Sequence, residues 1–332
     1  MTTILEVNGL HKEYHKQRTW IDRLFKRKGS SLYAVDDVSF SLQEGETLGL
    51  VGESGCGKST LSRAIMRLYE PTGGTIRFLG EDITSYEQRK MRHMRKNMQM
   101  VFQDPYSSLN PRMTVKEMLA ETIRFHQICQ NDKELNEYID YLLVRVGLNA
   151  NDASRYPKAF SGGQRQRLCI ARAISVKPKL LIADEPVSAL DVSVQAHILN
   201  LLEDLKKEFQ LSLIFISHDL SVVKYISDRV AVMYLGRIVE IGNSNEIFEN
   251  PVHPYTQALL SAVPRFDVDQ GKREKIALEG DPPSPYEKHT GCPFYSRCPK
   301  RMNICESMAP SFYATGATHL IRCHLAAEVG YQ

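Results

Sequence analysis

Short apolar runs and a segment with helical spacing alternate in the first part of the chain. Residues 4–7, 46–51 and 75–79 form short, mostly apolar runs that predict strands. After the run at 46–51, apolar residues recur at helical spacing and stop before Pro71; they are Leu61, Ile65 and Leu68. The pattern therefore predicts a strand, a connecting loop and a helix in that order.

A long helical segment separates this part of the chain from a second stretch of strands and helices. From residue 113 to about 176 the spacing is helical, and one predicted face consists of Ile139, Leu142, Leu143 and Val146. Strand and helix patterns alternate again from Leu180, and a further helical face consists of Ile198, Leu201, Leu202 and Leu205. Residues 229–240 predict a hairpin that turns near Gly236. We expect an α/β layered core with a helical subdomain at about 111–178.

The loop after the strand at 46–51 carries a phosphate-binding pattern. Its sequence, GESGCGKST at 52–60, matches G-x-x-x-x-G-K-[ST] between a strand and a helix. Glycines let backbone N–H groups surround phosphate oxygens, and the helix N-terminus adds the positive end of its dipole. Lys58 supplies a charge for the terminal phosphates, and Ser59 offers a hydroxyl to Mg²⁺. The alternative is a glycine-rich turn that matches by chance.

Two adjacent acids end the apolar run LLIADEP at 180–186. The carboxyl end of a buried parallel strand is where ligands bind in such sheets. We therefore expect Asp184 to hold Mg²⁺, directly or through water, and Glu185 to orient and deprotonate the attacking water. The alternative is a helix N-terminus that happens to be acidic.

Three further polar features lie at predicted element ends. FSGGQRQ at 160–166 opens an amphipathic helix, so Ser161 and the two glycines form a second anion site. A chain with one phosphate loop and two anion sites suggests that two subunits share two nucleotides. Gln103 and His218 each follow a predicted strand, from where Gln103 reaches metal and water and His218 reaches the γ-phosphate. Taken alone, either residue is more often structural.

Together these motifs resemble the nucleotide-binding subunits of ABC transporters. Residues 52–60 look like Walker A, Gln103 like the Q-loop, and 161–164 like the signature, with Phe160 where Leu is commoner. Asp184 and Glu185 look like Walker B with its catalytic glutamate, 188–191 like the D-loop, and His218 like the switch histidine. The resemblance implies a P-loop ABC-type ATPase core with a mixed sheet and a helical signature subdomain.

The resemblance also implies a role for each matching position. The catalytic residues are Glu185, His218 and Gln103, and the Mg²⁺ ligands are Ser59, Gln103 and Asp184. The residues that bind ATP are Tyr14, Gly52, Ser54, Gly55, Cys56, Gly57, Lys58, Ser59, Thr60, Gln103, Asp184, Ser161, Gly162, Gly163 and Gln164. Tyr14 is the first choice for stacking on adenine and Tyr33 the second, while an ordinary strand tyrosine is the alternative. We also expect the helix dipole to lower the pKa of Cys56.

Composition is that of a globular chain of about two domains. The 332 residues are 42% hydrophobic and 24% charged, and no apolar stretch approaches the roughly 18–20 residues of a membrane span. The N-terminus lacks the features of a signal peptide. We therefore expect a chain that does not cross a membrane itself and needs separate membrane subunits. The net charge of +3 is too small to argue for nucleic acid.

The segment 250–332 resembles the C-terminal extension of ATPases from oligopeptide and dipeptide permeases, and motif details resemble the F-type subunit. We expect an ABC ATPase domain at 1–250 and the extension at 251–332. The resemblance implies an importer driven by a heterodimer with a homologous D-type ATPase subunit. It also implies two transmembrane permease subunits, an extracytoplasmic peptide-binding protein that acts indirectly, and a peripheral location on the cytoplasmic face of the cell membrane.

The extension is small, irregular and rich in cysteine. Four of the seven cysteines of the chain, Cys292, Cys298, Cys305 and Cys323, lie there with the spacing C-x₅-C-x₆-C-x₁₇-C. Zinc sites usually begin with a tighter pair, and four thiolates on a wide loop suit a cubane about as well as a single ion. The family resemblance implies a [4Fe–4S] cluster, with Zn²⁺ as the alternative. We expect its loss to leave ATP binding by the core untouched.

Several alternatives stay open. The chain is also compatible with a soluble ABC-type ATPase acting on nucleic acid or ribosomes, although such relatives usually carry two cores or a long coiled coil. A further alternative makes the extension an iron or redox sensor, with the ATPase as scaffold. An importer of another cargo, such as a metal chelate, is equally compatible, because the ATPase does not touch the cargo. The basic segment 15–31 predicts either a short amphipathic helix or a solvated hairpin.

Overall fold

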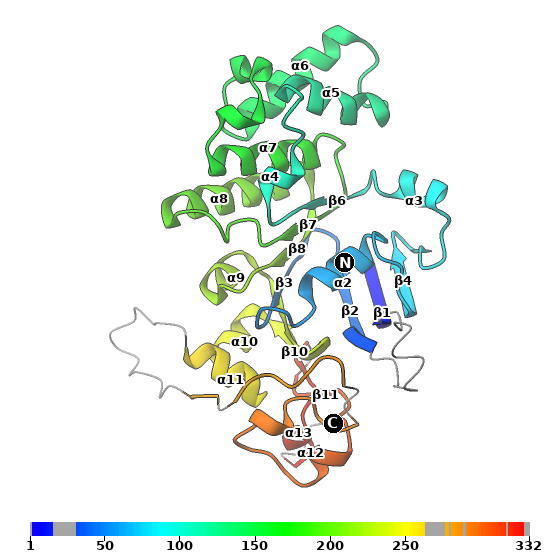
Figure 1. The fold of residues 1–332 in the computed structure, drawn as a ribbon, viewed down its shortest axis with the longest axis vertical. Coiled ribbons are helices and arrows are strands. Elements are labelled where there is room, and N and C mark those ends of the chain that lie inside the picture. The colour runs from blue at the N-terminus through cyan, green and yellow to red at the C-terminus, as the bar shows by residue number, and fades with distance from the viewer. Residues whose placement is uncertain are drawn as a thin grey trace, which may run out of the picture. The chain divides into compact units, whose positions relative to one another are not determined.

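A computed structural model describes residues 2–15, 31–262, 276–278, 280–287, 290–316 and 318–328 (Figure 1). Most of the basic segment 15–31 lies outside these residues. The chain divides into two compact units, which are described separately below. Unit 1 comprises residues 1–2, 43–47 and 86–216, and unit 2 comprises residues 3–42, 48–85 and 217–332.

Unit 1 contains a parallel sheet and the helical subdomain. Strand β7 (Leu180–Asp184) pairs in parallel with β6 (Met98–Val101) on one side and with β8 (Ser212–Ile216) on the other. Every residue of β7 and β8 is buried, which explains their continuous apolar sequences. The helices of this unit are α3 (Gln88–Met94), α4 (Pro105–Ser108), α5 (Val115–Phe125), α6 (Asp132–Arg145), α7 (Gly162–Ile174) and α8 (Val192–Phe209), with short 3₁₀ helices at Ala150–Ser154 and Pro157–Ala159.

The predicted apolar faces of two helices in unit 1 are confirmed. Helix α6 buries Leu135, Ile139, Leu142 and Leu143, and Val146, also buried, is its C-terminal cap. Helix α8 buries Ile198, Leu199, Leu201, Leu202 and Leu205. Periodicity located these faces because each helix has a single buried side in its unit.

Unit 2 contains an antiparallel sheet with the order β2-β1-β4-β5. Its strands are β1 (Thr3–His15), β2 (Ser31–Gln43), β4 (Gly73–Phe78) and β5 (Glu81–Asp82). The first helix of the unit, α2 (Lys58–Ile65), is shorter than predicted. Arg67 has a left-handed backbone (φ 52°) and Leu68 is 43% exposed, so Leu68 is not part of the apolar face.

A second group of strands in unit 2 mixes parallel and antiparallel pairing. Strand β3 (Thr47–Val51) runs parallel to β9 (Arg229–Tyr234), which forms an antiparallel hairpin with β10 (Arg237–Asn243). The hairpin turns at Leu235 and Gly236, both with positive φ, as predicted. The remaining helices are α9 (Leu220–Ile226), α10 (Ser244–Glu249), α11 (Pro254–Ser261), α12 (Ile304–Ser307) and α13 (His324–Glu328), with a 3₁₀ turn η3 (Tyr295–Arg297).

The C-terminal extension adds strands to this sheet. Strand β12 (Leu320–Ile321) pairs with β10, and β11 (Tyr313–Ala314) pairs with β12. In Figure 1 the orange and red extension gathers beside α11 and β10. Among the described residues, none of the helices combines the length and apolar character needed to cross a bilayer.

A buried carboxylate joins the extension to β10. Glu240 is fully buried and accepts hydrogen bonds from the backbone N–H groups of Val252 (2.8 Å) and His253 (3.1 Å). His319 Nε2 lies 2.8 Å from Glu240 Oε1, the oxygen that also accepts the Val252 N–H. A buried carboxylate is costly unless it is hydrogen-bonded, so these three contacts stabilise one arrangement of sheet, α11 and extension.

Candidate active site

The phosphate loop in unit 2 depends on glycine at three positions. Gly52, Gly55 and Gly57 have φ values of 152°, 80° and 108°. A Cβ on Gly57 would lie 2.1 Å from the Ala34 carbonyl oxygen, and one on Gly52 would lie 2.1 Å from the Met233 carbonyl oxygen. The loop therefore folds against β2 and β9 in a way that side chains prevent, and α2 begins directly after Gly57.

Lys58 is buried inside this loop. Its Nζ donates hydrogen bonds to the carbonyl oxygens of Gly52 (2.8 Å) and Glu53 (3.0 Å). The ammonium is thus held in the loop as the sequence predicts. Ser54 and Ser59 lie on the same loop and at the start of α2.

The prediction for Cys56 is wrong. Its thiol is 5% exposed, and burial raises its pKa, although the charge of Lys58 acts in the opposite direction. Burial in this loop therefore outweighs the positive end of the helix dipole. Alkylation of Cys56 is accordingly not a sensitive probe of this loop.

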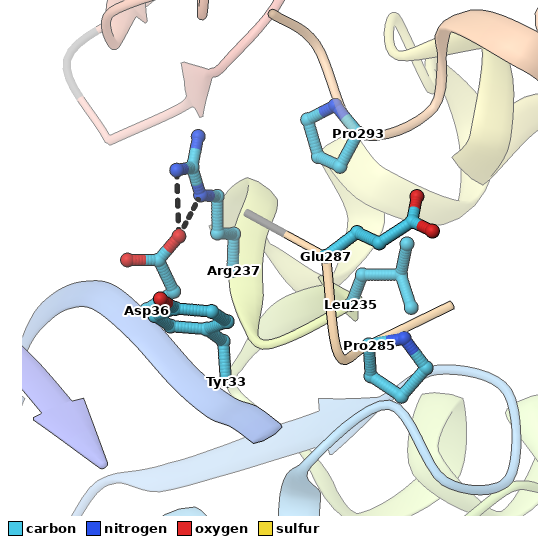
Figure 2. A pocket seen from close by; sticks show the side chains of 7 residues that line it. All are labelled: Tyr33, Asp36, Leu235, Arg237, Pro285, Glu287 and Pro293. Atoms are coloured by element: carbon cyan, nitrogen blue, oxygen red, sulfur yellow. Dashed lines mark hydrogen bonds and ion pairs between the residues drawn. The ribbon is translucent and has the colours of Figure 1, made fainter. Parts of the chain in front are cut away.

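Tyr14 lies beside the last residue of the phosphate loop. Its hydroxyl is hydrogen-bonded to Thr60, and its ring meets Tyr69 edge-on with centroids 6.0 Å apart. Tyr33 lines a different small pocket with Pro285 and Leu235, and its backbone N–H donates to the Pro285 carbonyl (3.0 Å; Figure 2). The contact with Thr60 favours Tyr14 for the adenine-stacking role.

In unit 1, an acidic pair ends β7. Asp184 is buried, and Glu185 follows it with a left-handed backbone (φ 47°). The Glu185 N–H donates to the Ile216 carbonyl at the end of β8 (3.0 Å). Gln103, which follows β6, donates from Nε2 to Glu185 Oε2 over 2.9 Å. The ends of β6 and β7 therefore bring Gln103 to Glu185, and the end of β8 holds the Glu185 backbone.

The serine-glycine segment forms the N-terminus of α7. Ser161 caps the helix: its Oγ accepts the Gln164 N–H (3.3 Å), and the Gln164 side-chain oxygen accepts the Ser161 N–H (3.0 Å). Gly162 lies next to Leu190, and a Cβ on Gly163 would lie 2.5 Å from Val194 Cγ1. Ser161 is exposed, Gly162, Gly163 and Gln164 are half-buried, and Phe160 is buried. The segment forms a helix N-terminus, where an anion is favoured.

His218 belongs to unit 2, between β8 and α9. It is exposed, and the next residue, Asp219, caps α9 by accepting the Ser221 N–H (2.8 Å). The phosphate loop, Tyr14 and His218 thus lie in unit 2, whereas Gln103, Ser161–Gln164, Asp184 and Glu185 lie in unit 1.

Comparison with known proteins identifies the family of the chain. The family model for ABC transporters matches residues 35–188, and the model for the oligopeptide/dipeptide transporter C-terminal region matches residues 239–305. An oligopeptide transport ATP-binding protein, AppF of Bacillus subtilis, is 53% identical over 97% of both chains. The chain belongs to the ABC transporter family. OppF of Haemophilus influenzae is 48% identical over 96% of both chains.

Solved ABC cassettes share the fold. The ATP-binding cassette MJ0796, determined as a dimer bound to ADP and Pi, has a TM-score of 0.64 at 25% identity; the match covers 73% of this chain and 99% of that one. CbiO1 of Clostridium perfringens, part of the cbiONQ transporter complex, has the same TM-score at 28% identity over 75% of this chain and 92% of that one. The α/β ABC ATPase fold expected from the motifs is therefore confirmed.

The four C-terminal cysteines of this ABC transporter subunit influence one another electrostatically. Burial, and to a smaller extent the neighbouring thiols, raises the pKa of Cys292 to about 12 and that of Cys323 to about 11. The pKa of Cys298 is also raised, by burial first and by Cys305. Within the described residues, however, no three or more His, Cys, Asp or Glu side chains are arranged as a metal-ion site.

The sequence analysis missed the residues that reach the phosphate loop from the distant end of the chain. The Tyr255 hydroxyl accepts the Glu53 N–H (3.0 Å), and Arg297 forms an ion pair with the Glu53 carboxylate. These residues lie 202 and 244 positions beyond Glu53, so no local pattern indicates the contacts. The extension therefore contacts the phosphate loop directly, whereas the expectation that loss of its metal leaves ATP binding untouched stays a prediction.

Proposed function

We propose that the chain is the ATP-binding and ATP-hydrolysing subunit of an ABC importer for oligopeptides or dipeptides. The names of its relatives and the match of its C-terminal region to the oligopeptide/dipeptide transporter family support this cargo. The observation that carries the ATPase assignment is the Gln103–Glu185 hydrogen bond at the end of the buried strand β7, together with an intact phosphate loop.

The proposed reaction uses residues of both units. Lys58 and the loop N–H groups bind the β- and γ-phosphates, and Tyr14 stacks on adenine. Ser59, Gln103 and Asp184 hold Mg²⁺, which neutralises charge on the phosphates. Glu185 accepts a proton from the attacking water, which Gln103 helps to orient, and His218 donates to the γ-phosphate.

The signature segment is proposed to complete the site of a partner ATPase. Ser161 Oγ accepts the Gln164 N–H, and its hydroxyl would donate to an anion alongside the N–H groups of Gly162 and Gly163. Gln164 fixes Ser161 through the capping box. The partner proposed is a homologous D-type subunit in a heterodimer.

We place this heterodimer on the cytoplasmic face of the cell membrane as a peripheral component. Two transmembrane permease subunits form the pathway, and an extracytoplasmic binding protein delivers the peptide. Within the chain, residues 1–250 are the proposed ABC domain, with the helical subdomain at about 111–178, and residues 251–332 are the extension.

We further propose that Cys292, Cys298, Cys305 and Cys323 hold a [4Fe–4S] cluster. The spacing of the four cysteines and the electrostatic influence of the thiols on one another support the assignment. The chemistry of a cluster held in this way is structural: it cross-links an extension of short elements. Zn²⁺ on the same thiols is the competing outcome.

Co-expression tests the transporter assignment. The chain is produced with a D-type ATPase and two permease subunits, and the complex is placed in lipid vesicles. Binding protein loaded with a peptide should stimulate ATP hydrolysis, whereas binding protein alone should not. Stimulation by a metal chelate instead of peptide would overturn the cargo, and ATPase activity that responds only to RNA or ribosomes would overturn the transporter function.

A further inference from the structure

The phosphate loop contains a carboxylate that is paired with an arginine of the extension. Arg297 Nη1 lies 2.9 Å from Glu53 Oε2, and Nη2 lies 3.1 Å from Glu53 Oε1. This bidentate geometry makes the arginine–carboxylate contact stronger than a single hydrogen bond would. The Arg297 side chain is only 8% exposed, against 27% for Glu53, so solvent screens the pair weakly.

The pair is embedded in an aromatic cluster of unit 2. Phe294 is buried against Tyr234 and Tyr255, with ring centroids 5.2 and 5.4 Å apart. Tyr255 also accepts the Glu53 N–H, and Tyr234 lies within hydrogen-bond distance of Arg297 (3.5 Å). Burial opposes the charge on Arg297, but the contacts with Glu53 outweigh it and raise its pKa. Arg297 is therefore a fixed positive charge at the loop.

A second contact of the extension flanks the same loop. Figure 2 shows Pro285 of the extension next to Leu235, in the turn between β9 and β10, and Pro293 lines the same pocket. Within that turn, the Gly236 N–H donates to the Cys56 carbonyl of the phosphate loop (2.8 Å). The extension thus lies beside a turn that is hydrogen-bonded to the phosphate loop, as well as contacting Glu53.

Glu53 presents an electrostatic problem to an ATP site. Its carbonyl oxygen lies 3.0 Å from Lys58 Nζ, so the residue belongs to the wall of the loop that holds the phosphate-binding ammonium. An unpaired carboxylate there would repel the phosphates of ATP and offset the charge of Lys58. Arg297 removes this repulsion because it both neutralises the carboxylate and holds it.

We propose that Arg297 is a positioning residue of the ATP site, which pairs Glu53 so that the phosphate loop accepts ATP. The inference rests on the proposed function, because it takes 52–60 as the ATP site. Through Arg297, the cysteine-bearing extension contributes to nucleotide affinity. Arg297 acts through Glu53 and does not itself touch the nucleotide.

Binding of MgATP to the full-length chain tests this role. Arg297→Gln should raise the Kd for MgATP about tenfold, since a charge beside the phosphates is left unpaired. Glu53→Gln should bind as wild type or more tightly. The double variant Glu53→Gln/Arg297→Gln should return to within about threefold of wild type, and Arg297→Lys should retain most of the affinity.

A structural role alone makes different predictions. If Arg297 only held the extension in place, the double variant would bind as weakly as Arg297→Gln, and that result would overturn the proposal. The defect of Arg297→Gln should also shrink as salt concentration rises, because repulsion between charges is screened. A defect independent of salt would likewise count against it.

Arg322 provides a matched control. Like Arg297, it is a buried arginine of the extension that immediately precedes a cluster cysteine, and it is paired with a carboxylate, Asp37 (2.8 Å). Asp37 is not part of the phosphate loop, so Arg322→Gln should leave the Kd within about twofold. An equal loss in both variants would overturn a specific role for Arg297.

The same assay separates this inference from the proposed function. If the wild-type chain binds no MgATP, or if Lys58→Ala binds it normally, the assignment of the ATP site itself fails. If the wild type binds, Lys58→Ala does not, and Arg297→Gln is unaffected, only the role of Arg297 is refuted.

Discussion

Gln103 Nε2 lies 2.9 Å from Glu185 Oε2, which links the residue after β6 to the residue after β7. Glu185 itself has an uncommon left-handed backbone, and its N–H is tied to the end of β8. A non-glycine residue in this region carries backbone strain, and such strain is found where a side chain must be aimed. This backbone conformation orients the Glu185 carboxylate so that Gln103 Nε2 donates to it.

Replacing Glu185 by Gln should separate hydrolysis from binding. The amide keeps the shape of the side chain but cannot accept a proton from water, so ATP hydrolysis by the assembled transporter should fall by roughly 10²–10⁴. The Kd of the chain for MgATP should stay within a few-fold. Glu203→Gln, on helix α8, is the control and should remain active. Near-normal turnover in Glu185→Gln would remove Glu185 from the role of general base.

Replacing Gly57 by Ala should abolish ATP binding. Gly57 has φ 108°, and the added Cβ would lie 2.1 Å from the backbone carbonyl of Ala34, which has little freedom to move. Strain at a special backbone conformation and a backbone clash both oppose the loop conformation. Calorimetric titration with MgATP measures the effect.

Gly45 supplies the control for Gly57. It also has a positive φ, 75°, but an added Cβ meets nothing within 4 Å, so Gly45→Ala should cost only about 1 kcal/mol of stability and leave ATP binding intact. Normal binding by Gly57→Ala would show that the loop does not need this close approach.

Features that depend on residues close together in the sequence were predicted, whereas contacts between residues far apart in the sequence were not. Strand and helix faces such as that of α6 were predictable, because local periodicity mirrors burial. The sequence indicated that Gln103 and Glu185 each follow a strand, and parallel strands end at one edge of a sheet, but their hydrogen bond to each other was not predicted. The pairing of Glu53 with Arg297 was not predicted either, because no rule relates residues 244 positions apart. The pKa of Cys56 was misjudged because burial depends on tertiary packing.

Replacing Ser161 by Arg should suppress hydrolysis in the heterodimer without preventing this chain from binding ATP. The phosphate loop lies in the other unit of the chain, whereas the proposed role of Ser161 is in the partner's site. A bulky cation at the start of α7 blocks that site and opposes the helix dipole. Nucleotide binding to the isolated chain and ATPase activity of the complex are the two measurements.

Ser161→Ala distinguishes the steric effect of a large side chain from the loss of the helix cap. It removes the hydrogen bond to the Gln164 N–H, which costs about 1 kcal/mol, but leaves room for a nucleotide. Its ATPase activity should lie between those of wild type and Ser161→Arg. Loss of ATP binding in the isolated Ser161→Arg chain would instead indicate misfolding, and full activity of its complex would refute a shared site.

Acid should weaken unit 2 through His253. Its ring is fully buried, which lowers the pKa to about 4, although Glu240 acts in the opposite direction. The unfolded chain therefore binds a proton at higher pH than the folded chain does. The free energy of unfolding should fall as pH decreases from about 6.5 to about 4, by up to about 3 kcal/mol.

His253→Asn isolates this contribution. His253 Nδ1 accepts the Tyr255 N–H at the start of α11, and Asn supplies an acceptor there without titrating. Urea unfolding of both proteins between pH 4 and 7 should show a smaller loss of stability for the variant. Parallel pH profiles would show that His253 is not the group responsible.

Metal content is the final test of the extension. Chain purified without oxygen should be brown, absorb broadly near 400 nm and carry about four irons per chain, because four thiols that influence one another's pKa suit a cubane. Cys298→Ser should lose the iron, whereas Cys129→Ser, in the other unit, should keep it. A colourless wild-type chain with one zinc would overturn the cluster. Because Cys298 is next to Arg297, which pairs with Glu53, the iron-free variant should also bind MgATP more weakly. Unchanged affinity for MgATP would indicate that the extension and the phosphate loop are independent.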